Sequence, residues 1–203
     1  MDEAAQADVV DLVFSLRGEA IVPDYADALF RAVSGTLGWI ASEPRAGIHP
    51  IRGATESGER LMLSRRAQLV LRLPAARIDE ARILSGNRFE LGGDVEVGEG
   101  VVRPLAPYHV LYSPFVTTGH DNEQDFLAEA TRLVSAASID CKLIVGKRRE
   151  AAYRTSYISG HSLMLHGLST EHSLLVQSIG VGKHRLLGCG VFVPHKSIAP
   201  VAA

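Results

Sequence analysis

The sequence predicts an α+β fold made of two tandem ferredoxin-like modules, an RRM-like architecture. Apolar runs of strand length alternate with segments of helical periodicity in the order β-α-β-β-α-β, and this order occurs twice. No short repeat period is present, which indicates a duplicated architecture and not a solenoid. The 203 residues are 46% hydrophobic, enough for a sizeable core. The predicted modules are residues 1–104 and 105–203.

The first module begins with an acidic, alanine-rich segment, 1–7, and a predicted strand at 9–16. A helix is expected from Pro23-Asp24 to about Leu37, because proline and acids suit a first turn and apolar residues then recur at helical spacing. Gly38 ends it. The remaining expected elements are a long loop at 41–59, strands at 61–63 and 69–73, a helix at 75–84, and a hairpin of 89–91 with 95–97.

The second module follows a proline-broken link at 101–108. Asn122 is a good N-cap for a helix that reaches Ala137, with acids in its first turn. Ser169 opens a second helix that reaches Ile179. The predicted strands are 110–116, 143–145, 153–158, 162–165 and 191–193.

Cysteines and apolar runs restrict the class of protein. Cys141 and Cys189 are far apart and form neither a disulfide framework nor a metal-ligand spacing, so both are expected to be small buried residues in a reducing compartment. The chain opens without a signal-peptide pattern, and no apolar stretch approaches the ~18 residues of a membrane span. We therefore expect a cytoplasmic protein without a membrane partner.

The distribution of charge is more informative than the net charge of −2. Residues 1–104 carry 12 Lys and Arg against 16 Asp and Glu, a net −4. Residues 142–196 carry 8 Lys and Arg against 2 Asp and Glu, a net +6. This asymmetry predicts a localised contact with a polyanion in the last third of the chain.

A glycine-rich segment near the C-terminus, 180–194, is the most distinctive stretch. Four glycines surround Lys183, His184 and Arg185, and an apolar run at 191–193 follows. Such a loop can bring main-chain N–H groups and cations to a phosphate backbone. The alternative interpretation is a hairpin with two tight turns and solvated charges.

Four motifs together resemble the CRISPR-associated repeat-processing endoribonucleases, the RAMP-type nucleases of Cascade, and within them the myxobacterial MYXAN-type subgroup. The motifs are Asp11–Gly18, Gly47–Gly53, Leu63–Pro74 and the glycine-rich segment, so the resemblance runs over nearly the whole chain. It implies tandem ferredoxin-like modules and cleavage of CRISPR repeat RNA (pre-crRNA) into crRNAs. It also implies attack by the 2′-OH, which leaves a 2′,3′-cyclic phosphate, and a product that stays bound in a Cascade complex.

The candidate catalytic residues are His49, Tyr25 and Arg52. RNA self-cleavage needs a base, an acid and a cation, and histidine suits proton transfer near neutral pH. His49 matches the family's catalytic histidine by position, Tyr25 matches a tyrosine of the first helix that could pair with it, and Arg52 could supply charge. No lysine lies near His49, unlike in those relatives, so the second proton-transfer partner stays open. Without the resemblance, His49 reads as a residue that pins a turn and Tyr25 as a surface tyrosine.

The candidate RNA-binding residues are basic side chains and loop glycines. These residues are Arg45, Arg65, Arg66, Lys147, Arg148, Arg149, Arg154, Gly182, Lys183, His184, Arg185 and Gly188. The basic run 147–149 is expected directly after a strand, with Arg154 on the next strand. A solvated turn is the alternative for the basic run. Neither histidines nor cysteines show the spacing of a zinc site, so no metal and no other cofactor is expected.

The sequence leaves three functions open. The first is a metal-independent endoribonuclease with repeat RNA and other Cascade subunits as partners. The second is a non-catalytic RNA-binding subunit of a CRISPR effector complex, which the missing lysine favours. The third is a ferredoxin-like protein-interaction module, which specific RNA affinity would exclude.

Overall fold

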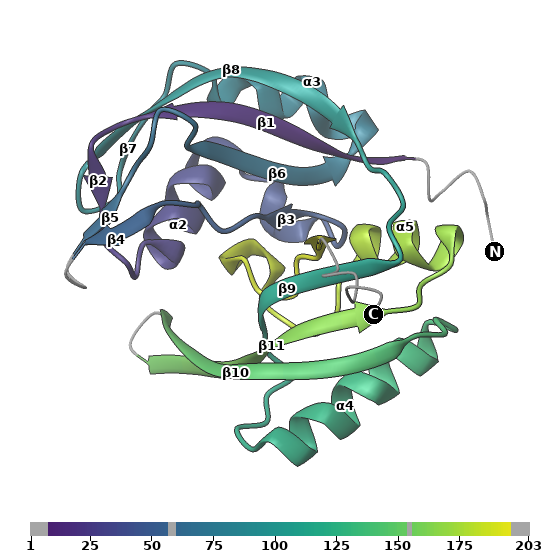
Figure 1. Ribbon diagram of the computed structural model, residues 1–203. Coiled ribbons are helices and arrows are strands. Elements are labelled where there is room, and N and C mark those ends of the chain that lie inside the picture. Colours follow the sequence, from purple (N-terminus) through teal and green to yellow (C-terminus); the bar gives the residue numbers. More distant parts are fainter. Residues whose placement is uncertain (1–7, 57–59, 154–155, 196–203) are drawn as a thin grey trace, which may run out of the picture. The chain divides into compact units, whose positions relative to one another are not determined.

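The computed structural model describes residues 8–56, 60–153 and 156–195, and the chain divides into two compact units (Figure 1). Unit 1 comprises the chain up to Leu105 together with Glu150–Ile158 and His184–Gly188. Unit 2 comprises Ala106–Arg149, Ser159–Lys183 and the chain from Cys189 onward. Two later segments of the chain thus belong to the unit that the first half builds.

Unit 1 contains a five-stranded antiparallel sheet of ferredoxin-like topology. Its order is β3-β6-β1-β8-β7, with β1 (Val9–Arg17) between β6 (Gln68–Pro74) and β8 (Asp94–Pro104). The edge strands are β3 (Gly47–Ile48) and β7 (Arg88–Glu90). The helical segments are α2 (Ala26–Thr36), η1 (Ile40–Ser42), η2 (Ala75–Arg77), α3 (Ile78–Ala81) and η3 (Arg82–Leu84). The predicted fold class is therefore confirmed for this unit.

Two predicted elements of unit 1 were wrong. The second strand of the ferredoxin order is β3, inside the segment expected to be loop, and not 61–63. Instead β5 (Arg60–Met62) pairs with β2 (Ala20–Ile21) and β4 (Ala54–Glu56) in a separate three-stranded sheet. Residues 101–104, expected as link, continue β8, because they pair with residues 10–13 of β1.

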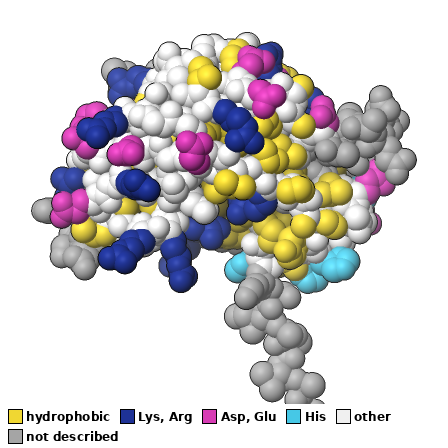
Figure 2. Space-filling view, turned by 90° about the horizontal axis from the view of Figure 1, so that it is seen from above, with side chains coloured by type: hydrophobic (Ala, Val, Ile, Leu, Met, Phe, Trp, Pro, Cys, Tyr) yellow, Lys and Arg dark blue, Asp and Glu magenta, His cyan; other side chains and the backbone are white. Residues whose placement is uncertain are grey.

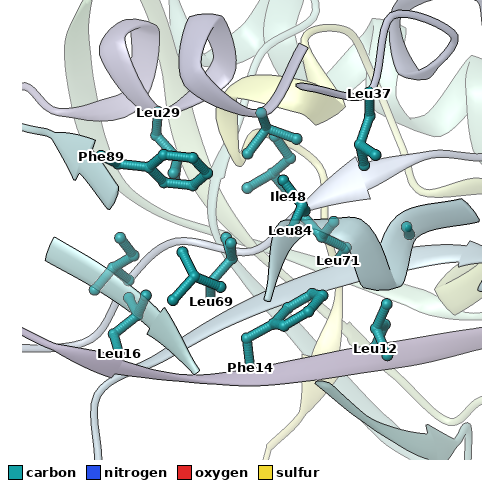
Figure 3. Packing of buried hydrophobic residues seen from close by; sticks show 14 of the residues in the cluster. Leu12, Phe14, Leu16, Leu29, Leu37, Ile48, Leu69, Leu71, Leu84 and Phe89 are labelled. Carbon is teal, nitrogen blue, oxygen red and sulfur yellow. The ribbon is translucent and has the colours of Figure 1, made fainter. Parts of the chain in front are cut away.

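The core of unit 1 follows from the alternation of side chains along the strands. Leu12, Phe14 and Leu16 of β1 point to the face that α2 and α3 cover, as Figure 3 shows. Leu29 of α2 and Leu84 of η3 pack against them. Residues 9, 11 and 13 consequently lie on the opposite face of the sheet.

Unit 2 contains a four-stranded antiparallel sheet in the order β10-β11-β9-β12 and repeats the ferredoxin-like topology. Its core joins the two helices to the inner faces of β9 and β11. Asn122 and Ser169 cap the helices as predicted, since each side-chain oxygen accepts a hydrogen bond from a first-turn N–H. The elements are β9 (Val110–Val116), α4 (Glu123–Ala136), β10 (Lys142–Tyr153), β11 (Ser156–His166), α5 (Thr170–Ile179) and β12 (Val193–Pro194).

The strands of unit 2 correct the predicted position of the basic run. Lys147, Arg148 and Arg149 lie within β10, which continues to Tyr153, and not in a turn after a shorter strand. Strands 153–158 and 162–165 were expected to be separate, but β11 is continuous from Ser156. Arg154 lies outside the described residues.

The surface carries charges of both signs. On the face drawn in Figure 2, Lys, Arg, Asp and Glu side chains are interspersed, and hydrophobic side chains gather in one area. This face does not present the single-sign field of a general nucleic-acid coat. Among the described residues, no helix is long and apolar enough to cross a membrane.

Candidate functional site

A buried charged cluster lies on the face of the unit 1 sheet opposite its helices. Asp11 of β1 is directly paired with Arg72 of β6 and with Arg103 of β8. Arg72 donates to both carboxylate oxygens, through Nε at 2.8 Å and Nη2 at 3.2 Å, and Arg103 donates through Nη2 at 3.2 Å. Arg72 is 1% exposed and Asp11 4%, so this is a bidentate ion pair removed from water.

His49 joins this cluster from the residue after β3. Its backbone N–H donates to the carbonyl of Val70 at 2.9 Å, which fixes the loop beside β6. Its Nε2 lies 3.3 Å from Oδ1 of Asp11, within ion-pair distance but short of the alignment of a regular hydrogen bond. The side chain is 9% exposed. His49 is thus held against a buried carboxylate by the strand order of the sheet.

Burial and charge set the protonation states of this pair. Burial lowers the pKa of His49 to about 4, since the opposing effect of the Asp11 contact is smaller and Arg72 adds to the decrease. Burial raises the pKa of Asp11, but the contact with His49 and the positive charge of Arg72 outweigh it and hold that pKa well below its ordinary value. At neutral pH the pair is therefore a carboxylate beside a neutral imidazole.

The Tyr25 hydroxyl supports the His49 loop by hydrogen bonds to the main chain of that loop. Its hydroxyl accepts from the N–H of Ile51 at 2.6 Å and donates to the carbonyl of the same residue at 3.3 Å. The side chain is buried, and burial raises its pKa to about 12 despite the bond to Ile51. The hydrogen bonds of the Tyr25 hydroxyl are thus with the main chain of the loop.

The basic candidates of the first half lie at separate places in unit 1. Arg52 is exposed, three residues beyond His49. Arg45 lies 3.9 Å from the carboxylate of Asp8. Arg65 and Arg66 are exposed in the turn between β5 and β6. Of these, Arg52 is nearest to His49 along the chain.

The glycine-rich segment is divided between the two units. Gly182 and Lys183 belong to unit 2, as do Lys147, Arg148 and Arg149 of β10. His184, Arg185 and Gly188 belong to unit 1, where η4 (Arg185–Leu187) packs against α2 and β3. The predicted single basic loop therefore supplies side chains to both units.

The main chain of this segment is largely engaged within the protein. The N–H of Lys183 donates to Thr117 and that of Gly190 to Phe115. A Cβ at position 182 would lie 2.3 Å from the Thr117 carbonyl oxygen, so glycine is required there for this close approach. Side chains are consequently the main means by which the segment can contact a ligand.

Asp11 and Arg72 are candidate functional residues that the sequence reasoning missed. Asp11 interrupts the apolar run of residues 9–14, and Arg72 interrupts that of residues 69–73. A charge inside a buried strand demands a partner, so these interruptions were the available signal. The pairing of Asp11 with Arg72 is visible only from the register of the two strands.

Comparisons with known proteins agree with this architecture. A family model described as Cas6 CRISPR matches residues 10–197. The CRISPR-associated endonuclease Cas6 of Myxococcus xanthus (strain DK1622) is 34% identical over 187 residues, which are 91% of this chain and 81% of that protein.

Two solved structures have the same fold. A Cas6-related protein from Pyrococcus furiosus has a TM-score of 0.65 at 16% identity, covering 92% of this chain and 97% of that one. A RAMP protein described as binding different RNA substrates has a TM-score of 0.62 at 16% identity, covering 90% and 98%. The family model and the M. xanthus relative show that this chain belongs to the Cas6 family of CRISPR-associated endonucleases.

Proposed function

We propose that this endonuclease cuts CRISPR repeat RNA once per repeat without a metal ion, with His49 as the general base. Family membership supplies the substrate class. The environment of the His49 ring supports this role: the ring is neutral at pH 7, and its Nε2 lies 3.3 Å from the buried Asp11 carboxylate. A neutral imidazole oriented by a carboxylate is suited to accept a proton.

Asp11 orients the base and the loop supplies the remaining groups. A carboxylate beside Nε2 favours the tautomer with the proton on that nitrogen, which leaves the lone pair of Nδ1 to take the 2′-OH proton. The 2′ oxygen then attacks phosphorus, the bond to the 5′ oxygen breaks, and the departing 5′ oxygen takes a proton from solvent water, which gives a 2′,3′-cyclic phosphate and a 5′-OH. Tyr25 acts by holding the loop, and Arg52 offers a cation for the phosphorane.

Basic side chains of both units hold the RNA backbone in this proposal. Exposed cations give sequence-independent, salt-dependent affinity, and hydrogen bonds to phosphate set the register. The proposed backbone contacts are Arg45, Arg65, Arg66, Lys147, Arg148, Arg149, Arg154, Lys183 and His184. Arg185 is proposed to contact a base of the RNA, and Gly182 and Gly188, both at positive φ, set the course of the segment that carries it. The cut product stays bound in the cytoplasm and joins other Cascade subunits.

The test is cleavage of the repeat RNA from the chain's own locus, in EDTA, on a denaturing gel. The wild type should give one cut with a cyclic phosphate end, and His49→Ala should bind equally and not cut. His166→Ala, an exposed histidine at the end of β11, is the matched control and should cut normally. Normal cutting by His49→Ala would refute the assignment of the base.

The burial of His49 also favours a second function. A side chain that is 9% exposed has little surface for a substrate, as expected of a non-catalytic RNA-binding subunit of an effector complex. In that case the wild type binds the repeat tightly and leaves it intact. The same gel, with a binding measurement beside it, separates the two functions.

A further inference from the structure

A cavity of about 310 Å³ lies within unit 1, and neither Asp11 nor His49 is among the residues that line it. It is lined by Phe30, Glu43, Pro44, Ala46, Tyr153, His184, Arg185, Leu186 and Leu187. The lining combines aromatic rings, aliphatic walls, one acid and one arginine. Unstacked RNA bases are held by this combination, because an aromatic ring stacks on the base while polar groups bind its edges.

The aromatic part of the lining comes from two distant segments. The rings of Tyr153 and His184 lie with centroids 5.2 Å apart and planes tilted by 56°. His184 has φ 62° and ψ 39°, in the left-handed region that non-glycine residues seldom adopt. The strained backbone and the ring contact together hold an aromatic pair at the cavity.

The Arg185 side chain is the main indication that the cavity can bind a ligand. All three of its guanidinium nitrogens are closed to water and have no hydrogen-bond partner among the described residues. Burial, together with the positive charge of Arg72, lowers its pKa to about 10. A buried guanidinium without acceptors is unfavourable. The Arg185 side chain would therefore gain hydrogen bonds by turning toward a ligand in the cavity that it lines.

Glu43 adds an acceptor of opposite charge to the same lining. Its side chain is 14% exposed and lies 3.7 Å from Nε of Arg77, and Oε1 accepts from the backbone N–H of Arg45 at 3.3 Å. A carboxylate has about four lone-pair sites, so acceptor capacity remains. An acid in the lining disfavours a phosphate group and favours a ligand edge that donates hydrogen bonds.

We propose that this cavity binds one unstacked guanine base of the RNA, a role that rests on the proposed function. O6 and N7 of guanine form the acceptor pair that arginine reads bidentately, and N1–H and N2–H on its other edge are donors for a carboxylate. Adenine lacks the second acceptor beside N7. Cytosine has its donor and acceptors on one edge, which would require Glu43 and Arg185 side by side, yet Arg185 forms no hydrogen bond with Glu43.

The test is binding of a uridine decamer with one central guanosine, compared with the same decamer carrying adenosine or cytidine, by fluorescence anisotropy. The wild type should bind the guanosine decamer at least about 10-fold more tightly. Inosine, which lacks the N2 amine, should weaken binding to the wild type and not to Glu43→Ala. A 7-deazaguanosine, which lacks N7, should weaken binding to the wild type and not to Arg185→Leu.

Arg88→Leu, an exposed arginine outside the cavity, is the control and should keep the guanosine preference. Arg185→Leu should also unfold at a higher temperature than the wild type without RNA, since it removes an unpaired buried charge. Equal binding of the three decamers by the wild type, or a loss of affinity with inosine that persists in Glu43→Ala, overturns the proposal. Repeat cleavage is scored separately: cleavage without guanosine preference refutes the cavity alone, and preference without cleavage refutes the proposed function alone.

Discussion

Replacing Asp11 by alanine should destabilise the protein by about 3–5 kcal/mol. The change removes the bidentate partner of Arg72, a buried charge that is 1% exposed. Breaking a buried ion pair by removing one partner typically lowers the unfolding free energy by this amount. The bond to Arg103 adds little, because the Arg103 side chain is 55% exposed. The loss should therefore come almost entirely from Arg72.

The assay is urea unfolding at pH 7, followed by circular dichroism. Asp27→Ala is the matched control: Asp27 pairs with Arg31, which is 72% exposed on α2, so its loss should change the unfolding free energy by at most about 0.5 kcal/mol. The double variant Asp11→Leu/Arg72→Met should recover most of the stability, because it removes both charges. A loss for Asp11→Ala within 1 kcal/mol of the control would refute this reasoning.

Three further predictions concern the same elements. The pKa of His49 is lowered in the folded state, so the unfolded state binds more protons between pH 6.5 and about 4. The unfolding free energy should therefore fall by roughly 3 kcal/mol as the pH decreases through that window. Urea unfolding at several pH values should show this loss in the wild type and not in His49→Asn. Tyr25→Phe should lower the unfolding free energy by about 1–3 kcal/mol, because the buried N–H of Ile51 loses its hydrogen-bond partner. A loss of cleavage without a loss of stability would instead assign Tyr25 a chemical role. Lys147→Ala should reduce the slope of log affinity against log salt for the repeat RNA by about 0.7, with Arg31→Ala unchanged, as titrations at several salt concentrations would show.

The helices and the order of the elements could be read from the residues themselves. Helical periodicity and the caps Asn122 and Ser169 are local, so they predicted α4 and α5 correctly. The apolar runs identified the central strands for the same reason. His49 was identified from its position in the glycine- and proline-rich segment, and its catalytic role stays a prediction.

Pairings between distant residues could not be read in this way. Strand β3 has two residues and exists only because it pairs with Arg72 and Leu71 of β6. Asp11 finds Arg72 and Arg103 at separations of 61 and 92 residues, set by the registers of three strands. A single sequence carries no local signal of register in such cases.

The residues thus determined on their own the main helices and the central strands, that the order is that of two ferredoxin-like modules, and that the last third of the chain is basic. Tertiary structure alone decided that His49 lies against a buried carboxylate and that residues 184–188 pack in unit 1. Propensity and periodicity act over a few neighbouring residues, whereas a buried charge pair or a cavity lining depends on which distant strands and segments the whole fold brings into contact.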